Sequence, residues 1–67
     1  MITIYLNGEA RGIPAETDIV RLLELFSLPS KRIAIELNKD VIRRTDWPAT
    51  IIREGDKLEV VHFVGGG

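Results

Sequence analysis

The last three residues of the chain are the ones whose type and spacing suggest chemistry. Gly65, Gly66 and Gly67 stand in a row, and Gly67 ends the sequence in a carboxylate. Glycine averages about 7% of residues in proteins, so three together at one chosen place seldom arise by chance. Glycines lack Cβ atoms and pass through narrow channels that exclude other residues. We therefore expect a tail that presents a reactive carboxylate, rather than a frayed end or a cloning remnant.

The chemistry open to this carboxylate is activation by a partner enzyme. A terminal carboxylate is ionised at neutral pH. It can attack the α-phosphate of ATP once the partner neutralises the phosphates with Mg²⁺ and cationic groups. The acyl adenylate that results has AMP as a good leaving group. Three glycines extend about 10 Å, which is enough for Gly65 and Gly66 to thread into the partner's site. The chain then binds no cofactor, and ATP and Mg²⁺ belong to the partner.

Catalysis by the chain itself is not expected. His62 is the only histidine and there is no cysteine, so no thiol-imidazole pair and no cysteine-bound metal site can form. No glycine-rich loop follows a strand and opens a helix to cradle a nucleotide. We expect His62 to be structural or to lie at a rim, and we predict no enzyme and no metal site.

Composition narrows the range of partners. The 67 residues carry nine Lys plus Arg against ten Asp plus Glu, a net charge of -1. This balance lacks the basic surface that holds phosphate backbones. No apolar run reaches the roughly 20 residues that cross a bilayer, and the N-terminus lacks the features of a signal peptide. We expect a cytoplasmic protein that binds neither nucleic acid nor membrane and is monomeric when free.

The N-terminal residues predict a hairpin followed by a helix. Apolar residues alternate over 2–6, Asn7-Gly8 suits a type I′ turn, and 9–13 is the returning strand. Thr17 is the expected N-cap, and Asp18 adds favourable charge at the start of the helix. Apolar side chains follow at helical spacing, namely Ile19, Leu22, Leu23 and Phe26. The helix should stop near Ser27, because Pro29 disfavours helical geometry before it.

The C-terminal half predicts three more strands. Alternation marks a strand over 33–37, a turn at 38–40 and a short extended pair at 41–42. Trp47-Pro48 should lie in an irregular connection, and 53–56 should form a turn before a last strand over 57–64. In that strand Leu58 and Val60 share the core face, and the opposite face carries Glu59, Val61 and Phe63.

This order of elements predicts an α+β fold, a mixed sheet packed against one main helix, with a domain over 1–64 and a glycine tail over 65–67. It matches the ubiquitin-like β-grasp fold. By analogy with that fold, the last strand lies beside the first in the centre of the sheet.

The chain also resembles the ThiS family of sulfur carrier proteins. The resemblance lies in Asn7-Gly8 in the hairpin, Asn38 before Val41-Ile42, Gly55-Asp56 before the final strand, and the ending VHFVGGG. It implies that Gly67 is adenylated, converted to a thiocarboxylate, and donates sulfur for the thiamin thiazole ring. Two departures are Arg43, where many members carry proline, and the extra Gly65. Neither touches the reactive carboxylate.

The resemblance also implies partners. These are an adenylyltransferase related to ubiquitin-activating enzymes, thiazole synthase, and a sulfur donor such as a cysteine desulfurase. Two alternatives stay open at this point. One is the small subunit of molybdopterin synthase, which shares the fold and the diglycine end. The other is a ubiquitin-like module that only binds partners or is conjugated to lysines.

Val61 and Phe63 are the candidate docking residues for the partner, because their face lies opposite the core. The alternative is that the segment around Trp47 covers them, although Trp47 itself is expected to be a lid on the core. The pairs Lys31-Arg32 and Arg43-Arg44 are expected to be solvated surface. Alternatively, they steer an acidic partner in a salt-dependent way.

Overall fold

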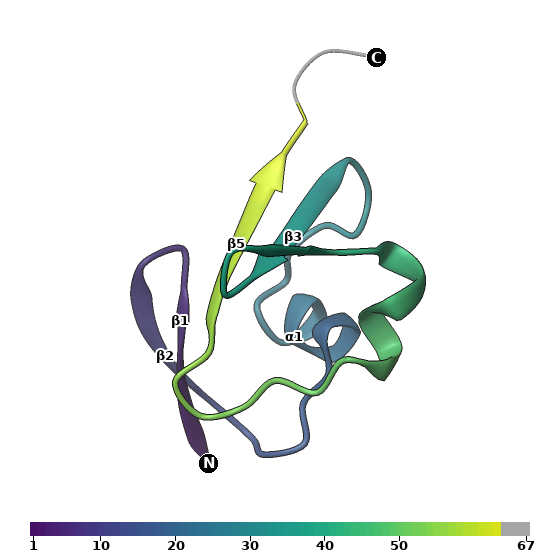
Figure 1. The fold of residues 1–67 in the computed structure, drawn as a ribbon. Coiled ribbons are helices and arrows are strands. Elements are labelled where there is room, and N and C mark those ends of the chain that lie inside the picture. Colours follow the sequence, from purple (N-terminus) through teal and green to yellow (C-terminus); the bar gives the residue numbers. More distant parts are fainter. Residues whose placement is uncertain (64–67) are drawn as a thin grey trace.

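The computed structural model describes residues 1–63, which form a five-stranded mixed sheet with one α-helix packed on one face (Figure 1). The elements in chain order are β1 (Ile2–Leu6), β2 (Glu9–Ile13), α1 (Ile19–Leu25), β3 (Ile33–Leu37), β4 (Asp40–Ile42), the 3₁₀ helix η1 (Arg44–Ala49) and β5 (Lys57–His62). The strand order in the sheet is β2-β1-β5-β3-β4. The predicted α+β architecture is therefore confirmed.

The N-terminal hairpin forms as its sequence predicts. β1 pairs antiparallel with β2, from Ile2 opposite Ile13 to Leu6 opposite Glu9. Between the strands, Asn7 has φ of 50° and Gly8 has φ of 84°. Asparagine and glycine tolerate positive φ better than other residues, which is why this pair closes a two-residue turn between twisted strands.

β5 lies in the middle of the sheet, as expected from the β-grasp analogy. It runs parallel to β1, with Leu6 opposite Leu58, and antiparallel to β3, with Ile33 opposite His62. The first and last strands of the chain are thus neighbours. The strand that leads to the glycine tail is paired on both sides near its start.

The core fills the space between the sheet and α1. The helix residues Ile19, Leu22 and Leu23 are buried, and Phe26 packs against them from a partly buried position. The sheet contributes alternate residues from its inner face, which are Ile4, Leu6, Ile13, Ile33, Ile35, Leu58 and Val60. Leu58 and Val60 therefore lie on the core face of β5, as their alternation predicts.

The start of the helix differs from the prediction. Asp18, rather than Thr17, is the N-cap, and its Oδ1 accepts a hydrogen bond from the Arg21 N–H at 2.8 Å. Thr17 is buried instead, and its hydroxyl donates to the carbonyl of Pro14 at 2.6 Å. The carbonyl of Thr17 accepts from the N–H of Ile52. Thr17 thus joins the core edge to a distant segment, a tertiary role that helix-start preferences do not anticipate.

Two other boundaries also differ. Trp47-Pro48, predicted to lie in an irregular connection, form part of the 3₁₀ helix η1, with Trp47 buried. β5 ends at His62, two residues before the predicted end of the last strand. Val64 and the predicted boundary between a domain over 1–64 and a tail over 65–67 lie outside the described residues.

The core assignment is testable by truncation. Leu22→Ala and Leu58→Ala should each lower the free energy of unfolding by about 2 to 5 kcal/mol, because each deletes a side chain at most 1% exposed and leaves a cavity. Leu25→Ala is the matched control, since Leu25 lies on the same helix but is 46% exposed. Urea unfolding followed by circular dichroism measures all three. Equal costs for Leu22→Ala and Leu25→Ala would contradict this core.

Candidate functional site

The site predicted from the sequence lies at the C-terminal end of β5 and beyond it. Gly67, the residue predicted to be modified, and Gly65 and Gly66, predicted to thread into a partner, lie outside the described residues. Phe63 is the last described residue. The described part of the site is therefore the end of β5 and the residues that hold it.

Asn7 fixes β5 against the N-terminal hairpin. Its N–H donates to the carbonyl of Leu58 at 2.8 Å, and its side-chain Oδ1 accepts from the N–H of Val60 at 2.8 Å. β1 ends at Leu6, so its ladder with β5 does not continue to Val60. The side-chain oxygen of Asn7 accepts this hydrogen bond instead of a strand carbonyl. An unpaired N–H on a buried residue such as Val60 would be costly. The sequence marked Asn7 only as a turn residue, and nothing local signals that it bonds across 53 positions.

Asn38 performs a similar task at the other side of β5. Its Oδ1 accepts from the N–H of Lys57 at 3.0 Å, and its N–H donates to the carbonyl of Lys57 at 2.7 Å. Its Nδ2 also donates to Asp56 at 3.1 Å. Asn38 has φ of 52°, so it closes the turn between β3 and β4 and holds the start of β5 at the same time. Two asparagines in left-handed turns thus position the strand that leads to the tail.

The proposed docking residues are exposed on the outer face of the sheet. Val61 is 45% exposed and Phe63 is 59% exposed. Val61 lies opposite Ala34 of β3, a residue with a small side chain. The segment around Trp47 does not cover these residues, because Trp47 packs in the core cluster beneath the other face. The alternative in which that segment shields them is wrong for the free chain.

Trp47 is the predicted lid on the core. It is 3% exposed, and its Nε1–H donates to the carbonyl of Ile42 at 3.0 Å. The guanidinium of Arg44 lies over its ring, 4.5 Å from the ring centroid. A buried indole with a satisfied N–H is a structural arrangement.

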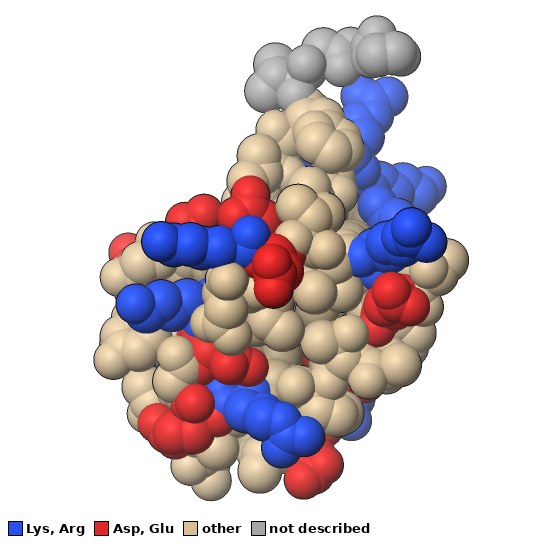
Figure 2. All heavy atoms as spheres, viewed as in Figure 1, with Lys and Arg blue, Asp and Glu red and all other residues tan. Residues whose placement is uncertain are grey.

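Hydrogen bonds connect the segments that carry the two basic pairs to each other and to the end of β5. Arg44 donates to the carbonyl of Ser30, just before Lys31 and Arg32. The carbonyl of Arg32 accepts from the N–H of Phe63 at 2.8 Å. All four cationic side chains of the pairs are exposed. Figure 2 shows Lys and Arg gathered along one side of the narrow projection at the top of the view.

His62 is exposed at the end of β5. Within residues 1–63, no three His, Cys, Asp or Glu side chains group closely enough to hold a metal ion. In the same part of the chain, no helix has the length and apolar character needed to span a membrane.

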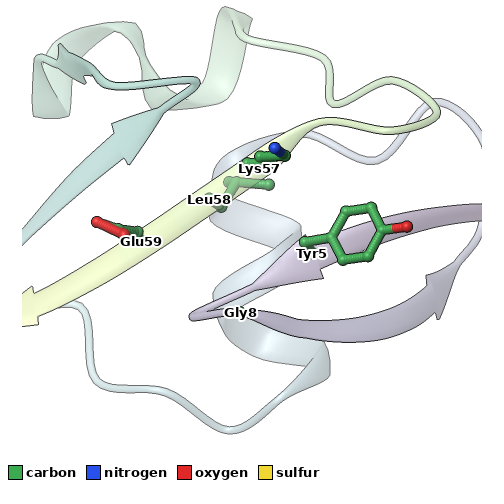
Figure 3. A pocket seen from close by; sticks show the side chains of 5 residues that line it. All are labelled: Tyr5, Gly8, Lys57, Leu58 and Glu59. Carbon is green, nitrogen blue, oxygen red and sulfur yellow. The ribbon is translucent and has the colours of Figure 1, made fainter.

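A shallow hollow lies on the outer face where β1 stops beside β5. It has a volume of about 470 Å³ and is lined by Tyr5, Gly8, Lys57, Leu58 and Glu59. Figure 3 shows Tyr5 on β1 and the other side chains on β5, next to the turn at Gly8. Its lining combines the aromatic ring of Tyr5 with one cationic and one acidic side chain, Lys57 and Glu59.

Comparisons with known proteins agree on one family. The family model described as ThiS family matches residues 4–67. The sulfur carrier protein ThiS of Bacillus subtilis is 32% identical over 96% of this chain and 98% of its own length. The crystal structure of the thiamine biosynthesis protein ThiS from Geobacter metallireducens superimposes with a TM-score of 0.86 at 29% identity, covering 98% of this chain and 100% of that one.

Longer relatives contain a similar region. A protein of Magnetococcus marinus named thiazole synthase is 41% identical over 96% of this chain. This chain spans only about 20% of the length of that protein.

The bond between Asn7 and Val60 generates a prediction. Asn7→Gly keeps the positive φ but removes the side-chain acceptor, so it should cost about 1 kcal/mol or more of unfolding free energy. Asn7→Asp is the matched control, because a carboxylate oxygen can still accept from Val60, and its cost should be smaller. Chemical denaturation compares the two variants. A Gly variant as stable as the wild type would show that this bond does not anchor β5.

Proposed function

This chain belongs to the ThiS family, and we propose that it is a sulfur carrier of thiamine biosynthesis whose Gly67 carboxylate is activated and converted to a thiocarboxylate. The observation that carries the proposal is the family match through residue 67, which includes the three glycines. The curated relatives of similar length that bear a functional name are sulfur carrier proteins. The chain acts as a carrier, and its partners supply the catalysis.

The chemistry proceeds in two steps. A carboxylate oxygen of Gly67 attacks the α-phosphorus of ATP, the bond to pyrophosphate breaks, and an acyl adenylate forms. Hydrosulfide then attacks the carbonyl carbon, the bond to AMP breaks, and the thiocarboxylate and a proton are released. Mg²⁺ and cationic groups of the activating enzyme neutralise the phosphates. No group on residues 1–63 is needed for either step beyond positioning the tail.

The partners follow from these steps. An adenylyltransferase related to ubiquitin-activating enzymes performs the activation. A donor such as a cysteine desulfurase supplies the sulfur as a persulfide, and a thiol reductant releases it as hydrosulfide while a disulfide forms. Thiazole synthase receives the sulfur. Proteins named thiazole synthase contain a region similar to this chain, which supports this partnership. The same relatives favour the thiazole pathway over the alternative of a molybdopterin synthase subunit.

Docking of the activating enzyme uses the exposed apolar side chains of Val61 and Phe63. They lie beside the start of the tail, so a partner that covers them also receives the glycines. An exposed apolar pair contributes binding energy when a partner removes it from water. Gly65 and Gly66 then thread into the active site, and ordering them costs about 1 to 2 kcal/mol per residue, which contacts with the partner must offset.

The free carboxylate is tested by extending the chain. One alanine added after Gly67 should abolish activation, because the nucleophile moves by about 3.3 to 3.6 Å and a side chain enters a channel sized for glycine. Exchange of radiolabelled pyrophosphate into ATP by the cognate adenylyltransferase is the measurement. A thermal melt checks that the fold is unchanged. Normal exchange by the extended protein would refute Gly67 as the reactive residue.

The docking residues are tested by charge insertion. Phe63→Asp should weaken binding to the adenylyltransferase by about tenfold or more, because an unpaired charge is left in an apolar interface. Val20→Asp is the matched control, since Val20 is an exposed apolar residue on α1. Calorimetric titration measures both affinities. If the two variants bind equally well, Phe63 is not part of the docking surface.

A further inference from the structure

β5 is longer than the strand beside it. β1 pairs with β5 only at Tyr5 opposite Lys57 and Leu6 opposite Leu58, and the chain then turns back. On the other side, β3 accompanies β5 as far as His62. Figure 1 shows the upper part of β5 extending beyond the β1–β2 hairpin, with β3 along one side only. β5 is the central strand of the sheet, yet its second half has no neighbouring strand on the β1 side. This half therefore has an open edge.

The hydrogen-bond pattern identifies the groups on this edge. Bonded and non-bonded pairs alternate along an antiparallel ladder. Phe63 donates to Arg32 opposite it, so residues 59, 61 and 63 direct their backbone groups to β3. Residues 58, 60 and 62 direct theirs to the opposite side, as the two bonds with Asn7 confirm. The carbonyl of Val60 and the N–H and carbonyl of His62 therefore face the β1 side of β5, beyond the residue at which β1 ends. Within residues 1–63, no strand pairs with them there.

This edge carries none of the usual protection. Exposed edges are commonly blunted by proline, charged side chains or bulges. Residues 60–63 are Val, Val, His and Phe, without proline or Lys, and their ladder with β3 is regular. Val61 and Phe63 are exposed beside the edge. The hollow next to Gly8 adds space where the hairpin ends. An edge of this kind is a template for a further strand.

The position of the edge identifies its occupant. Four residues, 64–67, separate Phe63 from the end of the chain and span at most about 13 to 14 Å. Any enzyme that acts on the Gly67 carboxylate must come that close to the edge. A second copy of this chain has no such reason to approach it. The edge and the reactive group therefore face the same partner.

The geometry points to strand addition: an extended segment of the activating adenylyltransferase pairs with β5 at Val60 and His62. This inference rests on the proposed function and adds the means by which the tail is held in register. Backbone hydrogen bonds fix the base of the tail relative to the partner's active site, and Val61 and Phe63 contribute side-chain contacts on the outer face. Extended segments that join a sheet edge commonly gain affinity in this way.

Amide exchange tests the inference directly. In the free protein, the N–H of His62 should exchange with deuterium faster than that of Val61, which faces β3, and that of Phe63, which donates to Arg32 just before β3. Addition of the adenylyltransferase with ATP should slow exchange at His62. Nuclear magnetic resonance of the ¹⁵N-labelled carrier resolves the three sites. If the His62 amide exchanges as fast in the complex as in the free protein, the inference is overturned.

A pair of variants tests the same bond by function. His62→Pro removes the outward N–H and leaves the pairing with β3 intact, because proline is tolerated where an edge N–H faces solvent. His62→Val is the matched control, since it changes the side chain and keeps the N–H. Pyrophosphate exchange should fall by about tenfold or more for the Pro variant, the factor that corresponds to roughly 1.4 kcal/mol, and stay near the wild-type rate for the Val variant.

The possible outcomes distinguish a failure of strand addition from a failure of the carrier function. If the wild type supports exchange and both variants match it, strand addition is wrong and the carrier function stands. If the wild type supports no exchange, the carrier function fails and strand addition fails with it. If the Pro variant does not fold, amide exchange on the wild-type complex decides. If the His62 amide exchanges slowly in a dimer of the free carrier but not in the complex with the enzyme, the edge serves self-association and strand addition by the enzyme is wrong.

Discussion

The pairing of β5 with β1 is the constraint on which the rest of the structure depends. It joins the two ends of the chain, since Leu6 lies opposite Leu58 and Asn7 bonds to Val60. A domain of this size buries only about 60% of the surface its unfolded chain exposes, so it cannot lose its central strand and keep a core. The core side chains of β5 lie against α1, and the outward residues of the same strand form the surface next to the tail.

This arrangement separates stability from chemistry along a single strand. The start of β5 pairs with β1 at Lys57 and Leu58 and with β3 from Leu58 onward, and Leu58 lies in the core. Among residues 1–63, the second half of the strand pairs only with β3. It adds Val60 to the core and exposes Val61, and Phe63 just beyond it is also exposed. The proposed function requires the Gly67 carboxylate to reach a partner, and Gly67 follows Phe63 by only four residues.

Much of the fold was predictable because its local patterns agree with its tertiary structure. The alternation in β1, β3 and β5 and the helical spacing from Ile19 to Phe26 each point toward the core that forms. Thr17 shows where such reasoning stops: both it and Asp18 suit an N-cap, but Asp18 caps the helix while the Thr17 hydroxyl bonds to Pro14. The role of Asn7 was hidden because its partner lies at the far end of the sequence. For the candidate site, exposure of Val61 and Phe63 followed from strand alternation, whereas the open edge depends on where β1 ends.

The central claim is that the Gly67 carboxylate becomes a thiocarboxylate, and the intact mass of the protein tests it most directly. The carrier is incubated with ATP, Mg²⁺, sulfide and its adenylyltransferase, and its mass is then measured with and without ATP. The account predicts an ATP-dependent increase equal to one sulfur atom replacing one oxygen atom, located by fragmentation at the terminal glycine. An unchanged mass with an active adenylyltransferase, or a sulfur atom at any other residue, would contradict it.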